Sequence, residues 1–337
     1  MKINDLRAVL EKYDKPELKE IAVRLYKSIP KAAKESGGLD ELLTDFSKGK
    51  KQTPKPPTVD FASLQVIVER FLKNVRFGFY FCPNRHVSKK KRIQWRFEAR
   101  RYVKDLVDVR GDDSDAAADL MIQFYYMLSY GENVTVFNSD TPFAAIGILP
   151  VDFLELILSK LFYNGVTPAK IRTAVFFILD AMLDCGHSWA SYCCELLVYA
   201  LKTPETKELA LEHCDAFPLE YEKFQQLKRH FEYRKGFPNY YRDRTSPAML
   251  KNAATELRLQ LKFGLFEYDE GISYFWKNYV GKNKEESLHV LLDSHLKYED
   301  LASWWVGEYE KAVADGVSPR ESLRIMYESK KKSLAKD

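Results

Sequence analysis

Basic side chains are concentrated between residues 85 and 104, where their type and spacing suit the binding of phosphate groups. Four of them recur at four-residue intervals, namely Arg92, Arg96, Arg100 and Lys104. This spacing places them along one face of a helix, next to an apolar seam of Trp95, Ala99, Tyr102, Leu106 and Val109. Such a stripe can neutralise several phosphates of a nucleic acid. The candidate nucleic-acid-binding residues here are Arg85, Lys89, Lys90, Lys91, Arg92, Arg96, Arg100 and Lys104.

Two other interpretations of this segment stay open. The charged stripe is also typical of a solvated surface, or of a positive segment that docks on acidic helices of the same molecule. The distribution of charge fits both a nucleic-acid surface and internal docking. Residues 1–45 are balanced, residues 46–110 carry seventeen basic and five acidic side chains for a net charge of +12, and residues 111–337 carry a net charge of −8.

A second segment, residues 223–244, mixes seven Lys and Arg with six Phe and Tyr. Aromatic and guanidinium groups together can stack on bases and hold phosphates. They serve equally well in a protein interface or as amphipathic side chains at the edge of a helical layer. The candidate nucleic-acid-binding residues in this segment are Tyr240, Tyr241, Arg242 and Arg244.

The cysteine and histidine residues between 185 and 214 do not have the spacing of a zinc site. Zinc ligands come as close pairs such as C-x2-C, whereas this chain has Cys185-x-His187 and adjacent Cys193 and Cys194. Cysteine is often a core residue. A helix face with Glu286, His289 and Asp293 lacks a matching second helix. We therefore expect neither a metal site nor a cofactor.

The common catalytic motifs are missing from the chain. It has no G-x-x-x-x-G-K-[ST], G-x-G-x-x-G, G-x-S-x-G or H-E-x-x-H. Catalytic residues can converge from distant positions, so the absence of these motifs does not exclude an enzyme and only removes the positive evidence for one. The sequence identifies no catalytic residue.

The composition indicates a mostly helical protein. Hydrophobic residues make up 46% of the 337 residues, and only 15 Gly and 14 Pro are present, too few for a fold rich in tight turns. No stretch resembles a signal peptide or reaches the roughly 20 apolar residues of a membrane span. The five cysteines are sparse and odd in number, which is typical of a reducing compartment. We predict a cytoplasmic protein without a membrane segment.

The pattern along the chain predicts three regions. Residues 1–46 form a small helical module that contains a hairpin at 3–29, in which Asp14 and Glu17 suit a capping box. Residues 47–58 (KGKKQTPKPPT and the preceding Ser47) are a Lys- and Pro-rich linker. Residues 59–337 form a large helical body. Within it, alternating aromatic residues predict at most one small β-hairpin near 75–82 and 134–137.

The body is predicted to be an array of helical hairpins from about residue 141. Helix starts recur where Ser or Thr precedes proline, because a hydroxyl caps the first turn and proline suits the first helical position. They are Thr141-Pro142, Thr167-Pro168, Thr203-Pro204, Ser246-Pro247 and Ser318-Pro319, and Asn283 provides a further cap. The expected helix pairs are 168–184 with 187–201, 204–214 with 218–233, 247–262 with 269–279, and 284–294 with 298–313. The core is expected at about residues 115–200, where helices are apolar nearly all round.

This architecture is an α-solenoid-like array or an irregular helical bundle. Its period of 35 to 43 residues is similar to that of tetratricopeptide and HEAT-type repeats, without their residue signatures. Stacked hairpins create extended surfaces that bind partners. We therefore predict a non-catalytic interaction or scaffold protein with a protein partner. The alternative is a nucleic-acid-binding protein that uses the basic helix near 85–104. The oligomeric state is not determined by the sequence.

Overall fold

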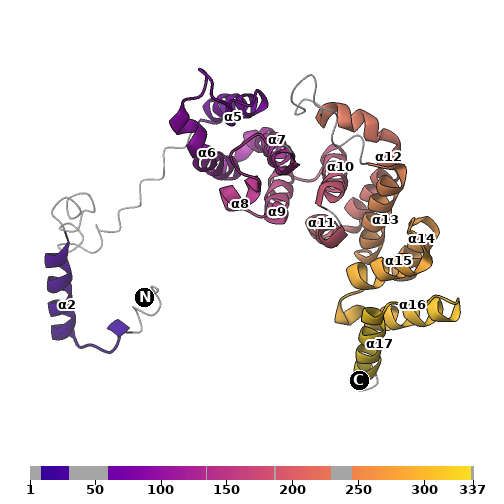
Figure 1. The fold of residues 1–337 in the computed structure, drawn as a ribbon. Coiled ribbons are helices and arrows are strands. Elements are labelled where there is room, and N and C mark those ends of the chain that lie inside the picture. Colours follow the sequence, from indigo (N-terminus) through magenta and orange to yellow (C-terminus); the bar gives the residue numbers. More distant parts are fainter. Residues whose placement is uncertain (1–8, 30–59, 134, 186, 229–244, 335–337) are drawn as a thin grey trace. The chain divides into compact units, whose positions relative to one another are not determined.

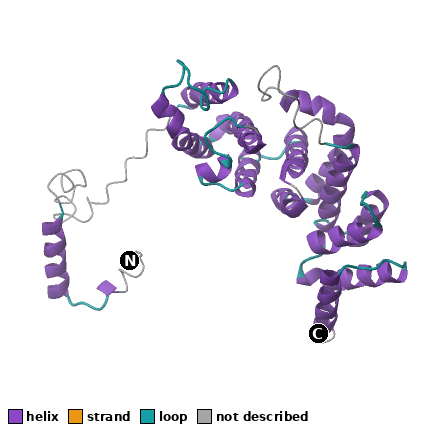
Figure 2. Ribbon diagram, viewed as in Figure 1, coloured by secondary structure: helices purple, strands orange, loops and turns teal. Residues whose placement is uncertain are grey.

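The computed structural model describes residues 9–29, 60–133, 135–185, 187–228 and 245–334. Every regular element in these ranges is a helix, and none of them contains a β-strand (Figure 2). The chain divides into two units, Met1–Val59 and Asp60–Asp337. The predicted all-α fold is confirmed. Among the described helices, none combines the length and the apolar character needed to cross a bilayer.

The first unit contains the helix α2 (Lys15–Ser28). The predicted capping box is confirmed, since the Glu17 amide donates to Asp14 Oδ1 at 2.9 Å and the Asp14 amide donates to Glu17 Oε2 at 3.0 Å. None of the residues of α2 is buried. Residues 3–8 of the predicted hairpin, residues 30–46 of the predicted module and the linker at 47–58 lie outside the described residues.

The second unit runs from α5 to α17, with helices that pack on their neighbours in the sequence (Figure 1). Its first helices are α5 (Phe61–Arg76), α6 (Lys89–Asp108), α7 (Ser114–Asn133), α8 (Pro142–Ile146) and α9 (Pro150–Leu161). The following helices are α10 (Pro168–Cys185), α11 (His187–Ala200), α12 (Pro204–Lys228), α13 (Pro247–Phe263), α14 (Tyr268–Asn278), α15 (Lys284–His289), α16 (Ala302–Ala314) and α17 (Glu321–Leu334). The π-helical turn η2 (Val290–His295) continues α15, and the 3₁₀ turns η1 (Gly111–Asp113) and η3 (Glu299–Leu301) precede α7 and α16.

Four of the five predicted proline starts are confirmed, because α8, α10, α12 and α13 each begin at the proline. The hydroxyl of Ser246 accepts from the Met249 amide at 3.2 Å, as the capping rule requires. The predicted start at Ser318-Pro319 is wrong, since α17 begins at Glu321. Arg320 forms a two-pronged ion pair with Glu285, at 2.7 and 2.8 Å, which holds the segment before α17 against α15.

Two further predictions about the body are wrong. Residues 204–228 of the expected pair 204–214 and 218–233 form one continuous helix, α12, with Pro218 inside it, and residues 229–233 lie outside the described residues. Proline removes one backbone hydrogen bond, but the buried face formed by Ala210, Cys214 and Phe217 continues up to Pro218 and packs in the main core, which favours an unbroken helix. The other three intervals each hold two helical segments, as expected. They are α10 with α11, α13 with α14, and α15 continued by η2 with η3 and α16.

The predicted β-hairpin near 75–82 and 134–137 is also wrong for the described residues. Residues 77–82 form turns in which Gly78, with a φ of 67°, accepts at its carbonyl from the amides of Phe81 and Cys82. The turn also separates the aromatic side chains, because it buries Tyr80, leaves Phe79 half-buried and exposes Phe77 and Phe81. The two segments do meet, with the rings of Tyr80 and Phe137 6.4 Å apart, but through side chains.

The core lies where the sequence predicts it. Buried apolar residues of α7, α9 and α10 belong to one large cluster that reaches from α5 to α13. A second, smaller cluster joins α13 and α14 to α16 and α17. The helices that are apolar nearly all round are thus the ones surrounded by protein.

Candidate functional site

The helix α6 is anchored by its predicted apolar seam. Trp95, Ala99, Tyr102 and Leu106 are buried, whereas Val109 is half-buried and ends the helix as its C-cap. The Trp95 ring stacks on Phe137 at 3.8 Å, and its Nε1 donates to Asn138 Oδ1 at 2.9 Å. These contacts fix which side of α6 faces the core, and therefore which side faces solvent.

The opposite side of α6 carries the predicted basic residues. Seven of the eight candidates between 85 and 104 are exposed, and Arg92 is half-buried. None of them forms an ion pair with a carboxylate in the part of the chain that the structure describes. Docking of this positive segment on acidic helices is therefore not observed in the described residues. We define the basic face of α6 as Lys89, Lys90, Arg96, Arg100, Arg101 and Lys104; the sequence analysis did not single out Arg101, which is also exposed.

Two of the predicted arginines have structural roles. Arg92 Nη1 donates to the carbonyl of Val87 at 2.6 Å, which holds the chain before α6. Arg100 Nε donates to the carbonyl of Ile146 at 2.6 Å and so satisfies the end of α8. Gly147, with a φ of 73°, lies so close that a Cβ there would be 2.5 Å from Arg100 Nη2. Variants of Arg92 or Arg100 would therefore combine lost charge with lost packing.

Apolar side chains also lie on the outward side of α6, which the sequence analysis did not single out. Ile93 and Phe97 are 52% and 57% exposed, and the Arg96 guanidinium carbon lies 5.0 Å from the centre of the Phe97 ring. The signal was present in the sequence, because Ile93 and Phe97 are four residues apart and fall outside the buried seam. Aromatic and cationic groups are thus mixed on one exposed surface.

The C-terminal end of α6 is capped by a buried lysine. Lys160 of α9 donates from Nζ to the carbonyls of Val107 and Val109, at 2.7 and 2.5 Å. Burial, together with the nearby Arg110, lowers the pKa of Lys160 from 10.5 to about 8, while Asp108 raises it. Lys160 thus completes the hydrogen bonds that a helix end leaves open.

The lowered pKa of Lys160 predicts a stability that rises with pH. Between pH 8 and 10.5 the unfolded chain binds a proton that the folded protein does not, so the free energy of unfolding increases with pH there. From near pH 7 to near pH 9.5 this rise is about 2 kcal/mol. Urea unfolding at both pH values measures it, with Lys160→Met as the comparison. If the two proteins have parallel pH profiles, Lys160 does not have a lowered pKa.

The remaining predicted site residues do not assemble into a site. Tyr240, Tyr241, Arg242 and Arg244 lie outside the described residues, as do the side chains of Cys185 and His187. Cys193, Cys194 and Cys214 are buried, and burial raises the pKa of the Cys194 and Cys214 thiols, which makes them poor nucleophiles. Within the described ranges, no three His, Cys, Asp or Glu side chains are grouped to hold a metal ion.

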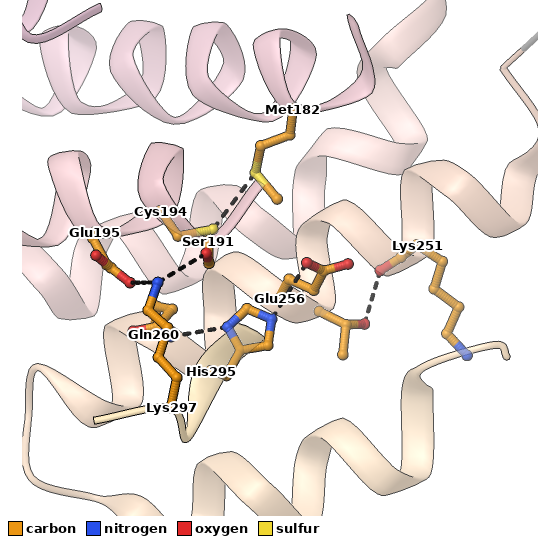
Figure 3. A network of polar contacts seen from close by, with 10 residues as sticks. Met182, Ser191, Cys194, Glu195, Lys251, Glu256, Gln260, His295 and Lys297 are labelled. Carbon is orange, nitrogen blue, oxygen red and sulfur yellow. Dashed lines mark hydrogen bonds and ion pairs between the residues drawn. The ribbon is translucent and has the colours of Figure 1, made fainter. Parts of the chain in front are cut away.

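A buried polar network joins α11, α13 and η2 (Figure 3). The Gln260 amide nitrogen lies 2.9 Å from His295 Nδ1, and His295 Nε2 lies 3.3 Å from Glu256 Oε2. Because Gln260 donates to Nδ1, the ring proton is on Nε2 and faces Glu256. Nearer the surface, Lys297 Nζ contacts Glu195 at 3.1 Å and Ser191 at 3.3 Å.

This network is structural rather than catalytic in its geometry. His295 is fully buried and both of its ring nitrogens are engaged, so it has no free position for a substrate. The network could not be predicted from the sequence because its members lie up to 106 positions apart. The only sequence signal is that Glu256 and Gln260, one helical turn apart, lie among the apolar residues of α13.

A cavity of about 410 Å³ lies between α14 and α16. Its buried carboxylate, Glu308, accepts from Trp276 Nε1 and from Lys311 Nζ, both at 2.7 Å. Since both oxygens of Glu308 have partners, the cavity offers no unpaired buried group to a ligand. The basic face of α6 remains as a surface on which several exposed cations lie close together without ion-pair partners among the described residues.

No protein-family model, curated protein or solved structure matches this chain.

Proposed function

We propose that this chain is a non-catalytic interaction protein whose basic face of α6 binds the phosphate backbone of a nucleic acid. The observation that carries the proposal is the exposure of these cations without ion-pair partners in the described residues. Elsewhere in the same unit, several basic side chains pair with carboxylates: Lys170 with Asp115, Arg172 with Glu220, Arg258 with Asp215 and Arg320 with Glu285. The contrast supports an external anion as the partner of α6.

The first turn of α6 supports the same proposal. Lys89, Lys90 and Lys91 lie at the N-terminal end, and this turn has no acidic residue. The helix dipole is positive there, so each cation costs about 0.3–1 kcal/mol of stability where it is not screened. The same positive end attracts phosphate. This arrangement disfavours folding slightly and favours anion binding.

The dimensions of the basic face suit a nucleic-acid strand. At about 1.5 Å per residue, Lys89 and Lys104 are separated by about 22 Å along the helix. One strand of B-DNA presents about six phosphates over that length. Over α6 as a whole, eight basic residues oppose three acidic ones. The face can therefore contact several phosphates at once.

Removing three cations from the basic face is expected to weaken the binding of nucleic acids of any sequence to a similar extent. The variant Lys90→Gln, Arg96→Gln, Lys104→Gln spares Arg92 and Arg100, which bond to backbone carbonyls. Its affinity for a labelled oligonucleotide near 50 mM salt should fall at least about tenfold, and the slope of log K against log salt should decrease by about 2 to 3. Fluorescence anisotropy at several salt concentrations measures both quantities.

The matched control removes the same charge from other exposed lysines of the body. Lys251, Lys277 and Lys332 are exposed and lie on α13, α14 and α17. The variant Lys251→Gln, Lys277→Gln, Lys332→Gln should bind like the wild type. Absence of wild-type binding at low salt, or equal losses in both variants, would reject the basic face as the binding site.

A protein partner is the second candidate, as for a scaffold. Trp189, Tyr192 and Tyr199 are exposed on α11, and exposed aromatic side chains are typical of protein interfaces. The Trp189 and Tyr192 rings lie 6.0 Å apart, and Lys297 Nζ lies 4.1 Å from the Tyr192 ring centre. These residues identify the surface on which a protein partner would be sought first.

A further inference from the structure

The basic face of α6 contains an apolar platform that phosphate binding alone does not require. Ile93 and Phe97 are one helical turn apart on the side of α6 opposite the buried seam. Lys90, Arg101 and Lys104 belong to the same outward side. Phe97 is more exposed than buried, so its ring contributes little to the core. An aromatic ring surrounded by cations suggests a ligand that has both a flat apolar face and negative charge.

A second aromatic group precedes α6 in the sequence. The ring of Phe79 stacks on His86 at 4.4 Å with an angle of 10° between planes, and on Phe77 at 5.6 Å. Phe77 is 57% exposed. The loop that carries these rings is held by Asn84, whose amide nitrogen donates to the carbonyls of Phe79 and Cys82, both at 2.7 Å.

The same Asn84 also fixes the other end of the loop. Its Oδ1 accepts from the amides of His86 and Val87, at 2.9 and 2.7 Å. With four hydrogen bonds from one side chain, the aromatic group before α6 is held in one arrangement. A preorganised aromatic surface loses little conformational entropy when it binds.

From these observations we infer that the surface of α6 takes single-stranded nucleic acid in preference to duplex, with a base stacked on Phe97. This inference rests on the proposed function. In a duplex the base faces are stacked on one another, and only their edges are accessible in the grooves. In a single strand the bases can leave the stack and lie on aromatic side chains while cations hold the backbone. Arg96, close to the Phe97 ring, can contribute to both contacts.

The charge and the shape of the surface favour this ligand over an anionic membrane. A helix that lies in a membrane interface inserts a continuous apolar face. The continuous apolar face of α6 is the Trp95, Ala99, Tyr102 and Leu106 seam, which is buried against the rest of the unit. What is left outside is an isolated pair, Ile93 and Phe97, among cations. Such a pair suits one or two bases better than a lipid layer.

The test compares a single strand and a duplex with full-length protein. The probes are a fluorescein-labelled 20-nucleotide oligo(dT), an oligo(U) of the same length, and a 20-base-pair DNA duplex. Phe97→Ala should raise the Kd for both single strands about tenfold or more and leave the Kd for the duplex unchanged. Its salt dependence should equal that of the wild type, because no cation is removed.

Two control variants separate stacking from other effects. Val66→Ala removes an apolar side chain that is 63% exposed on α5, and it should not change any Kd. Phe97→Trp should retain single-strand binding, and oligo(dT) should quench its fluorescence more strongly than that of the wild type. Circular dichroism of each variant establishes that the fold is retained.

The outcomes distinguish this inference from the proposed function. Equal affinity for single strand and duplex, with no effect of Phe97→Ala, would overturn the stacking inference and leave phosphate binding by the basic face intact. No binding of any of the three probes would overturn both. Binding to phosphatidylserine vesicles that is lost in Phe97→Ala, without binding to nucleic acid, would also overturn both and identify a membrane surface.

Discussion

Replacing His295 with leucine is expected to lower the free energy of unfolding by about 3–5 kcal/mol. The carboxylate of Glu256 is buried at the end of the His295 ring, with 3.3 Å between the two groups. Removing the imidazole leaves that carboxylate buried without its hydrogen-bond partner, and a buried unpaired charge is much more costly than a lost surface contact. Urea unfolding monitored by circular dichroism measures the change.

The double variant Glu256→Leu, His295→Leu shows whether the unpaired charge is the cause. Replacing both partners with apolar side chains removes the group that needs solvation, so the double variant should be more stable than His295→Leu alone. Together with the single variant Glu256→Leu, these proteins form a double-mutant cycle, which should give a favourable coupling energy between the two residues. If the double variant is the less stable of the two, the loss comes from cavity formation, and the Glu256 charge is not responsible.

Local signals in the sequence were sufficient for most helix boundaries. The capping box at Asp14 and Glu17 and the proline starts of α8, α10, α12 and α13 were predicted because a cap and its helix are a few residues apart. The buried seam of α6 was predicted for the same reason, since its members share one helix face. Features that depend on one turn of helix are thus encoded locally.

Features that depend on tertiary packing were not predicted. Pro218 indicated a break in α12, but the buried face on which Phe217 lies continues up to it, and packing outweighs the lost hydrogen bond. The alternating aromatics at 77–81 indicated a strand, and a turn at Gly78 satisfies the same pattern. In both cases two structures fit the local sequence, and contacts with distant residues decide between them.

The candidate site likewise combines features that the local sequence determines with features that depend on tertiary packing. The cations of α6 could be predicted from their spacing, but their exposure and lack of partners depend on where the acidic helices lie, which spacing does not indicate. Arg100 illustrates the limit, because its bond to the Ile146 carbonyl joins residues 46 positions apart. The exposed Phe97 could have been found from the sequence, since its position opposite the seam follows from Trp95 and Ala99.

Trp95 and Phe97 lie on opposite sides of α6 and are expected to respond in opposite ways to substitution. Trp95→Ala should lower the free energy of unfolding by about 3–5 kcal/mol, because it removes a fully buried ring stacked on Phe137 and leaves a cavity. Trp95→Phe keeps an aromatic contact but loses the bond to Asn138, so its effect should be smaller.

Phe97→Ala should change the free energy of unfolding by less than about 0.5 kcal/mol, since exposed side chains contribute little to stability. Urea unfolding of Trp95→Ala, Trp95→Phe and Phe97→Ala, each beside the wild type, measures these differences. A large loss of stability in Phe97→Ala would mean that its ring supports the fold. The exposed ring would then not be available to stack on a base. A small loss in Trp95→Ala would mean that α6 is not anchored through the seam, in which case the basic face would have no fixed orientation toward solvent.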